Sequence, residues 1–184
     1  MAPGWVMLRL LPGSISFPLV TSDGQTSKIA LILEYDGTRY CGFQYQSGVP
    51  TIQGELEKAI TRLTGERRRV LAASRTDTGV HAWGQVASFR TGAQYPAEVF
   101  RSALNHYLPE DIAVRSAHRV RDDFNVLRQA TGREYEYHIL NSRTRSPLRK
   151  GRAHLVPQPL DVEAMARAAR DLEGTHDFAS FVTD

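Results

Sequence analysis

Residues 72–82, which read A-A-S-R-T-D-T-G-V-H-A, constrain the fold more than any other stretch of the chain. An apolar run at residues 70–73 leads into this stretch, and Val86, Ala87 and Phe89 follow it. Two apolar runs on either side of a polar turn predict two buried strands that meet at a loop. A carboxylate on such a loop is held by its scaffold while it stays open to a ligand, so Asp77 is the first candidate functional residue.

Strands and helices alternate around this loop. Thr51 and Gly65 have the properties of helix-capping residues, and the apolar side chains between them follow helical spacing. Pro96 marks the start of a second helix. The predicted strands are residues 28–35, 69–74, 83–91 and 111–118, and the predicted helices are residues 52–64 and 96–108. This β-α-β-β-α-β order predicts an α+β fold of the ferredoxin-like or RRM-like kind, an antiparallel sheet with both helices on one face and the other face free.

The chain divides into three segments. Residues 1–27 have three prolines, three glycines and no sustained period, so we expect a disordered N-terminal extension. Residues 28–122 form the predicted N-terminal α+β domain. Residues 123–184 contain a predicted strand at 132–141 and a helix at 161–173 capped by Asp161, with an apolar side that should face inward. A strand and a helix cannot bury a sheet, so we expect an incomplete second α+β half.

Composition limits the class of protein. The 184 residues include 41% hydrophobic and 23% charged residues, which is typical of a globular protein. Cys41 is the only cysteine, so an intrachain disulfide is excluded and nothing indicates an oxidising compartment. No apolar run approaches the roughly 20 residues that span a bilayer. We therefore expect a cytoplasmic protein without a membrane segment.

Basic residues are unevenly distributed. The formal net charge is +3, yet residues 115–152 contain nine arginines and Lys150 against four acidic residues, a local balance of +6. Arginine binds phosphate through a planar fork and stacks on bases, so this clustering favours a nucleic-acid partner. The alternative is a GC-rich genome that replaces lysine with arginine on solvated surfaces. Charge alone does not decide between these two interpretations.

Asp77 has three possible roles. Asp77 and Gly79 are ordinary turn residues, so the stretch could be only a tight turn. A turn does not require Arg75 or His81, however, and an aspartate beside an arginine has a lowered pKa and remains a carboxylate, which can act as a nucleophile. Asp77 and His81 could also be metal ligands, but metal sites normally need a third ligand, and the sequence offers none nearby.

Several aromatic residues are compatible with either a core or a base-stacking role. Phe43, Tyr45 and Trp83 lie beside predicted strands, where aromatic residues usually belong to the core. Tyr135 and Tyr137 lie on one face of a predicted strand, and both interpretations remain open for them. The sequence contains no Walker loop, nucleophile elbow or dinucleotide fingerprint, so phosphoryl transfer, serine hydrolysis and NAD chemistry lack support.

The string S-R-T-D-T-G-V-H-A resembles the signature of the TruA family of tRNA pseudouridine synthases, and further blocks resemble that family in the same order. These blocks are E-Y-D-G-T-R-Y-C-G-F-Q (34–44), T-I-Q-G-E-L-E (51–57), G-Q-V-A-S-F-R-T (84–91), N-H-Y-L-P-E-D-I-A-V (105–114), R-E-Y-E-Y-H-I-L-N (133–141) and L-E-G-T-H-D-F-A-S-F (172–181). The resemblance extends from about residue 28 to the end of the chain.

The resemblance implies an isomerase that converts uridine to pseudouridine at positions 38 to 40 of the tRNA anticodon stem-loop. It implies no cofactor, no metal and a homodimer when the protein is full length. Asp77 would be the catalytic nucleophile, Tyr135 would pack against the target base, and Arg75 would occupy the space left by the flipped nucleotide. Residues 115–152 would then follow tRNA phosphates.

The sequence departs from the family in two respects. The family's F-H-A-R motif is replaced by Phe124-Asn125-Val126-Leu127, and Phe43 stands where tryptophan is usual. Family members also continue with further strands and a helix, so we expect a C-terminally truncated chain whose activity is open. The alternatives are a catalytically inactive tRNA-binding module and, with less support, a carboxylate hydrolase or a metal protein.

Overall fold

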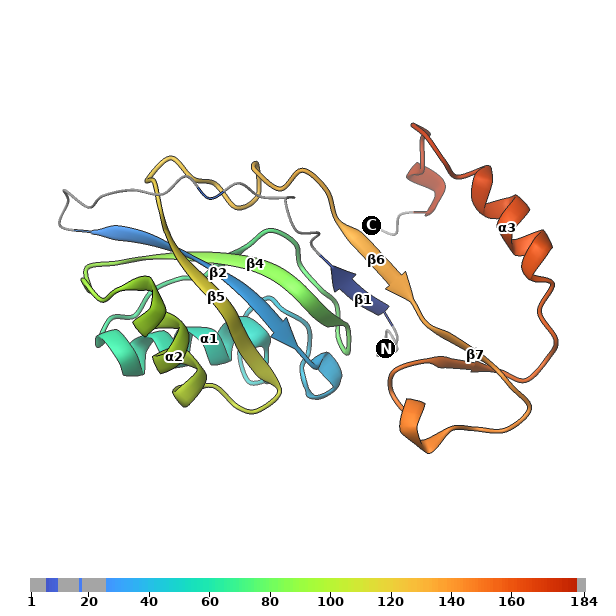
Figure 1. Ribbon diagram of the computed structural model, residues 1–184, viewed down its shortest axis with the longest axis horizontal. Coiled ribbons are helices and arrows are strands. Elements are labelled where there is room, and N and C mark those ends of the chain that lie inside the picture. Colours follow the sequence, from blue (N-terminus) through green and yellow to red (C-terminus); the bar gives the residue numbers. More distant parts are fainter. Residues whose placement is uncertain (1–5, 10–16, 18–25, 182–184) are drawn as a thin grey trace.

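A computed structural model describes residues 6–9, 17 and 26–181. The chain has an α+β fold with a multistranded sheet and three helices, which confirms the predicted class (Figure 1). The strands are β1 (Val6–Arg9), β2 (Ser27–Tyr35), β3 (Leu71–Ala72), β4 (His81–Thr91), β5 (Ile112–Val120), β6 (Glu134–Tyr137), β7 (Ile139–Asn141) and β8 (His154–Val156). The helices are α1 (Ile52–Thr64), α2 (Ala97–Tyr107) and α3 (Val162–Arg170), and 3-10 turns occur at Gly37–Arg39, Pro147–Arg149 and Ala179–Phe181.

The main sheet has the strand order β5-β2-β4-β1-β6. The short strand β3 is an additional partner of β4 outside this order. Strand β2 is antiparallel to both neighbours, with Ile29 opposite Phe89 on β4 and opposite Arg119 on β5. Ile29, Leu31 and Leu33 belong to one buried cluster and Ala30 to another, so β2 is buried on both faces, which explains the apolar run that predicts it. Strand β3 is shorter than predicted, because only Leu71 and Ala72 pair with β4.

Helices α1 and α2 cover one face of the sheet, as Figure 1 shows. The Thr51 hydroxyl accepts a hydrogen bond from Gly54 N at 3.2 Å, and Gly65 ends α1 with a φ of 73°. Both predicted capping residues of α1 therefore have that role. The buried core between the helices and the sheet is formed by large apolar residues from both layers: Leu56 and Ile60 of α1, Phe100 and Leu104 of α2, and Ile29, Leu31 and Leu33 of β2.

The opposite face of the sheet is partly covered, although we expected it to be free. Phe124 and Val126 are each 1% exposed and pack with Val86 and Val120. The Lys28 ammonium donates hydrogen bonds to the carbonyl oxygens of Asp122 and Phe124, which fixes this segment across the sheet. The motif that departs from the family pattern therefore supplies core residues, since its Phe and Val side chains are buried.

The structure also differs from the expected disordered extension at residues 1–27. Residues 6–9 form β1, which is parallel to β4 and antiparallel to β6, and Leu8 is completely buried. Ser27 already belongs to β2. Residues 1–5, 10–16 and 18–25 lie outside the described residues. Strand β1 matters for the site because it connects β6 to the central strands.

The predicted strand at 132–141 is divided into two strands. Its first part, β6, joins the main sheet, whereas β7 pairs in parallel with β8 in a separate small sheet. The break falls at His138, whose carbonyl oxygen accepts a hydrogen bond from His154 N at 2.7 Å. The chain therefore leaves the main sheet at this residue and pairs with the segment that follows.

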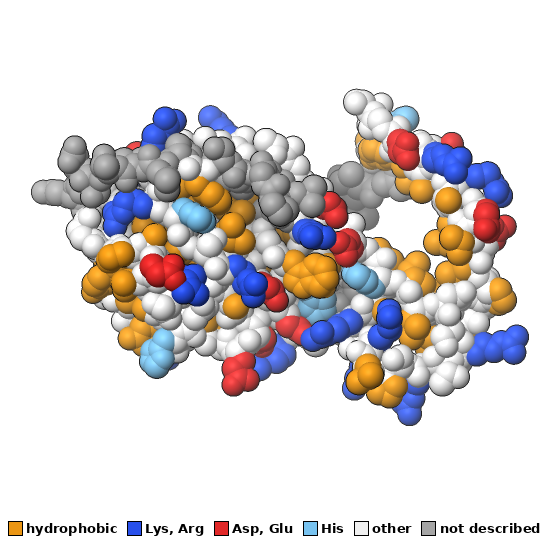
Figure 2. Space-filling model, viewed as in Figure 1, with side chains coloured by type: hydrophobic (Ala, Val, Ile, Leu, Met, Phe, Trp, Pro, Cys, Tyr) orange, Lys and Arg blue, Asp and Glu red, His pale blue; other side chains and the backbone are white. Residues whose placement is uncertain are grey.

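Helix α3 lies apart from the sheet at the other end of the molecule (Figure 1). Val162, Met165 and Leu172 are exposed, so the apolar side that we expected to face inward has no cover within the described part of the chain. Figure 2 shows an open gap, bordered partly by hydrophobic side chains, between the segment that contains α3 and the part of the molecule that contains the main sheet. The helix ends at Arg170, three residues before the predicted end. No helix in the described ranges is long and apolar enough to cross a membrane.

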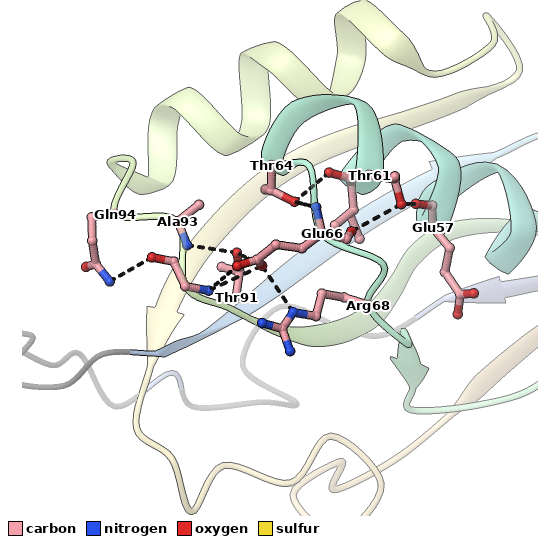
Figure 3. A network of polar contacts seen from close by, with 10 residues as sticks. Glu57, Thr61, Thr64, Glu66, Arg68, Thr91, Ala93 and Gln94 are labelled. Carbon is pink, nitrogen blue, oxygen red and sulfur yellow. Dashed lines mark hydrogen bonds and ion pairs between the residues drawn. The ribbon is translucent and has the colours of Figure 1, made fainter.

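A carboxylate joins the end of α1 to the end of β4 (Figure 3). Glu66 Oε2 accepts hydrogen bonds from Thr91 Oγ1 at 2.7 Å and from Arg68 Nε at 3.1 Å, and Glu66 Oε1 accepts one from Gly92 N at 3.1 Å. Hydrogen bonds from Arg68, Thr91 and Gly92 outweigh partial burial and lower the pKa of Glu66 from its usual 4.5 to about 2. The ionised carboxylate therefore stabilises the fold.

We expect Glu66→Gln to lower the free energy of unfolding at pH 7 by about 1–2 kcal/mol, a range that allows for partial solvent screening. Because the pKa of Glu66 is lowered in the folded chain, its contribution is complete above about pH 5 and is lost as the pH falls through 4.5 toward 2. Urea unfolding between pH 7 and pH 2.5 measures both effects. Glu173→Gln, at an exposed position after α3, is the control and should change neither. An equal loss in the two variants would contradict this prediction.

Candidate active site

Asp77 lies on the loop between β3 and β4, with its side chain exposed. The backbone forms the turn that the sequence predicts, since Val80 N donates to Asp77 O at 3.1 Å and Gly79 has a φ of 79°. The Asp77 carboxylate forms no hydrogen bond or ion pair with any other described residue. The turn and an open carboxylate are therefore compatible: the backbone makes the turn, and the side chain is left available.

Residues 35–43 hold the Asp77 loop in place through hydrogen bonds. The Tyr35 hydroxyl is hydrogen-bonded to Thr76 Oγ1 at 2.8 Å, and Phe43 N donates to Thr76 O at 2.9 Å. Gly79 N donates to Tyr40 O at 3.3 Å. Thr76 is only 5% exposed, so its polar groups need these partners. The residue directly before Asp77 is thus fixed through both its side chain and its backbone.

Two glycines allow the segment and the loop to approach each other closely. A Cβ atom at Gly37 would lie 2.0 Å from Val80 O, and one at Gly42 would lie 2.7 Å from Thr76 O. Gly42 also has a φ of 84°, a conformation that other residues rarely adopt. Both glycines belong to the E-Y-D-G-T-R-Y-C-G-F-Q block, so the two most distinctive blocks of the sequence are in direct contact.

His81 is a structural residue of the loop. It is 5% exposed, and its Nδ1 accepts a hydrogen bond from Gly37 N at 3.0 Å. The Nδ1 atom also lies 3.2 Å from Asp36 Oδ1, and the Nε2 atom lies 3.2 Å from Gly151 O. Since both ring nitrogens are engaged, His81 is a poor partner for Asp77 in a metal site. Among the residues described, no three His, Cys, Asp or Glu side chains group as metal ligands would.

Tyr135 is brought to the Asp77 loop by β6. Its hydroxyl is hydrogen-bonded to Ser74 Oγ at 2.9 Å, and the Arg133 guanidinium donates to Ala73 O through Nη2 at 2.7 Å and Nε at 3.3 Å. The ring remains 51% exposed, and Tyr137 is 55% exposed. Neither tyrosine is a core residue, so the side of the ring that is not occupied by the loop is available to a ligand.

Gln85 and Tyr35 form the buried base of the loop. Gln85 Nε2 donates to Ser74 O at 2.7 Å, and its Oε1 is buried without a hydrogen-bond partner among the described residues. Burial raises the pKa of Tyr35 to about 12, although hydrogen bonds with Thr76 and Gln85 oppose this effect. Tyr35 is therefore protonated at neutral pH. The sequence did not predict the contacts of Tyr35, Gln85, Ser74 and Arg133. The only signal for these residues was that each lies in one of the sequence blocks that resemble the family.

Arg75 is exposed and does not form an ion pair with Asp77 among the described residues. It lines a pocket of about 190 Å³ together with Phe43 and Leu127. The sequence argument that Arg75 keeps Asp77 ionised by direct contact is thus not supported by the arrangement. Of the other aromatic candidates, Phe43 is buried in the core, whereas Tyr45 and Trp83 are each about half exposed.

Comparison with known families defines the class of this protein. Residues 31–127 match the family model described as tRNA pseudouridine synthase, and this match covers more than half of the chain. The matched region includes the 35–43 segment and the Asp77 loop that it supports. The chain therefore belongs to the tRNA pseudouridine synthase family.

Individual relatives narrow the comparison to proteins named tRNA pseudouridine synthase A. The chain is 45% identical to the relative from Thermoanaerobacter pseudethanolicus over 153 residues, 83% of this chain and 63% of the relative. It is 48% identical to that from Myxococcus xanthus over 154 residues, 84% of this chain and 58% of the relative. It is 49% identical to that from Roseiflexus castenholzii over 151 residues, 82% of this chain and 56% of the relative. The matches thus span about 56–63% of the length of these relatives.

The contact between Gly42 and the loop predicts a specific effect of substitution. Gly42→Ala should lower the free energy of unfolding by about 2–4 kcal/mol, because the new methyl group meets a backbone oxygen and the backbone is left-handed. Gly48→Ala is the matched control, since Gly48 has a φ of 81° but nothing within 4 Å of its Cβ position. It should lose only about 1–2 kcal/mol. Urea unfolding measures both, and equal losses would show that the close approach has no energetic role.

Proposed function

We propose that the chain is the Asp77-bearing part of an enzyme that isomerises uridine to pseudouridine in tRNA. The observation that supports this proposal is an exposed carboxylate that has no partner among the described residues, on a loop fixed by Tyr35, Phe43 and Tyr40. A nucleophile needs an accessible side chain in a fixed place, and this loop provides both features. Membership of the tRNA pseudouridine synthase family supplies the reaction class.

The proposed reaction is an isomerisation without a cofactor. The Asp77 carboxylate attacks the uracil ring or the ribose carbon, and the N-glycosidic bond breaks. The base then turns and rejoins the ribose through C5, and the bond between the Asp77 oxygen and the substrate carbon breaks, which regenerates the carboxylate. C5 loses its proton while N1 gains one, so the atoms balance. Tyr135 would pack against the base, and Arg75 would fill the space that the flipped nucleotide leaves. The exposed ring of Tyr135 and the exposed side chain of Arg75, both near the loop, are consistent with these roles.

The proposed substrate is the tRNA anticodon stem-loop at positions 38 to 40, and the proposed assembly is a cytoplasmic homodimer. Arginines of residues 115–152 would contact tRNA phosphates. We further propose that residues 28–122 are a ferredoxin-like domain and that residues 123–184 begin a second α+β domain. The strand order β5-β2-β4-β3 with α1 and α2 on one face supports the first of these assignments.

A second candidate function is tRNA binding without chemistry. The observation that favours it is the length comparison, because the matches span only about 56–63% of the relatives. Residues in the remaining part of those relatives could be needed for the reaction. Binding and chemistry are therefore measured separately in the experiment that follows.

Asp77→Asn should abolish the chemistry and retain binding. The assay measures pseudouridine in a tRNA transcript treated with the 184-residue chain, and with a chimera that joins it to the C-terminal part of the Myxococcus xanthus relative. We expect the chimera to form pseudouridine and Asp77→Asn to slow it by at least about 10³-fold, because the variant lacks the nucleophile. The dissociation constant for tRNA should change by less than about threefold, since the side chain keeps its shape.

Asp123→Asn is the control, because Asp123 is exposed and pairs with Arg121 on the surface. It should leave the rate unchanged. An Asp77→Asn chimera that retains more than about a tenth of the rate would remove Asp77 from the mechanism. Binding by both proteins without any pseudouridine would favour the second candidate function.

Substitutions of Tyr135 and Ser74 distinguish the contribution of the Tyr135 ring to the reaction rate from that of its hydroxyl. Tyr135→Phe and Ser74→Ala each remove the same hydrogen bond, so their effects on the single-turnover rate of the chimera should be less than about fivefold and should not add in the double variant. Tyr135→Ala also removes the ring and should slow the reaction by about 10- to 100-fold. If Tyr135→Phe proves as damaging as Tyr135→Ala, the proposed packing of the ring against the base is wrong.

A further inference from the structure

A basic pocket of about 570 Å³ lies on the outer side of α1, and we call it the α1 pocket. Its lining includes five cationic side chains and one acidic residue, Glu57. The cations come from α1 itself and from the extended segment after Gly65: Lys58, Arg62, Arg67, Arg68 and Arg69. This excess of positive charge lies outside residues 115–152, which the sequence singles out as the basic region.

Two of these cations have no partner. Arg62 and Arg67 form no hydrogen bond or ion pair with another residue in the described part of the chain. By contrast, Lys58 pairs with Glu55 at 2.8 Å and Arg68 pairs with Glu66 at 3.1 Å. Two guanidinium groups that lack a carboxylate, in a pocket with one acid, form a site for a bound anion.

The segment after Gly65 alternates between exposed and less exposed side chains. Arg67 and Arg69 are exposed, whereas Glu66 and Arg68 are less exposed and pair with each other in the network of Figure 3. The Glu66 network therefore holds the segment that carries Arg67 and Arg69.

An aromatic ring accompanies these charges. Tyr45 also lines the α1 pocket and is 47% exposed, and the Arg69 guanidinium carbon lies 5.4 Å from the centre of its ring. Arginine forks beside an exposed aromatic ring bind phosphodiester groups and stack on bases, the combination that single-stranded nucleic acid requires. The pocket therefore fits a nucleotide strand better than an isolated anion.

A second pocket, which shares Arg69 with the α1 pocket, extends to Arg75 of the Asp77 loop. Arg69 lines both the α1 pocket and the adjoining pocket of about 190 Å³, and Arg75 lines that second pocket from the Asp77 loop. Phe43, which also lines the second pocket, donates its backbone N–H to the residue before Asp77. A series of arginines thus leads from the α1 pocket to the candidate nucleophile.

We propose that the RNA strand that presents its uridine to Asp77 continues past Arg75 and Arg69 into the α1 pocket. There Arg62 and Arg67 bind its phosphates, with Tyr45 beside its bases. The identity of the RNA rests on the proposed function, whereas the binding site rests on the arrangement of these side chains. In residues 115–152, Arg115 pairs with Glu34 and Arg121 pairs with Asp123, whereas Arg62 and Arg67 have no such partner in the described part of the chain.

The experiment compares two double variants of the 184-residue chain that remove the same charge. Arg62→Gln/Arg67→Gln should weaken binding of a tRNA transcript by about tenfold or more and reduce the slope of log K against log salt by about 2. Arg167→Gln/Arg170→Gln is the matched control, because both side chains are exposed on α3 and neither lines the α1 pocket. The control should bind like the unsubstituted chain. Fluorescence anisotropy at several salt concentrations measures both quantities.

A conservative variant shows whether weaker binding is caused by the lost charge or by a change in folding. Arg62→Lys/Arg67→Lys should keep the salt slope, since the phosphate contacts retain their charge. Binding and slope that stay unchanged in Arg62→Gln/Arg67→Gln, or that fall equally in the α3 control, would overturn the inference. Arginine-dependent binding without any pseudouridine from the chimera would reject the proposed chemistry and leave this inference standing. Pseudouridine formation with unchanged binding would reject this inference alone.

Discussion

The position of Asp77 depends on a contact between two backbone segments that are closer than a side chain would allow. Gly37 and Gly42 lie directly against the carbonyl groups of Val80 and Thr76. This approach lets backbone groups of the 35–43 segment reach the loop, where they provide the hydrogen bonds that a buried residue such as Thr76 needs. The scaffold thus holds the loop through its backbone and leaves the carboxylate free, a division of roles that suits a reactive group.

Two other parts of the chain meet at the same loop. Strand β6 contributes Tyr135 and Arg133 from one side, and the arginine series of the α1 pocket reaches Arg75 from another. The loop is therefore the point where the exposed Tyr135 ring, the Asp77 carboxylate and the Arg75 side chain come together. Each of them has its own structural support, so substitutions at one should leave the others in place.

Local signals account for the parts that could be predicted from the sequence. Thr51 and Gly65 define α1 through their own hydrogen bonds and backbone angles, and Asp77 lies on the loop that its neighbours predict. Contacts between distant residues could not be predicted in this way. The bond between Ser74 and Tyr135 joins positions 61 apart, and β1 is a strand only because β4 and β6 lie on either side of it. The role of His81 likewise depends on Gly37 and Gly151, which no spacing rule connects to it.

Strand β1 has a consequence for the order in which the molecule assembles. It is synthesised before the other described strands, yet its antiparallel partner β6 is made more than a hundred residues later. Helices α1 and α2 and strands β2, β4 and β5 can form their core in the meantime, because those elements lie together in the sequence before β6. Tyr135 reaches Ser74 only after β6 is synthesised, so the candidate site is completed on a core that can already have formed.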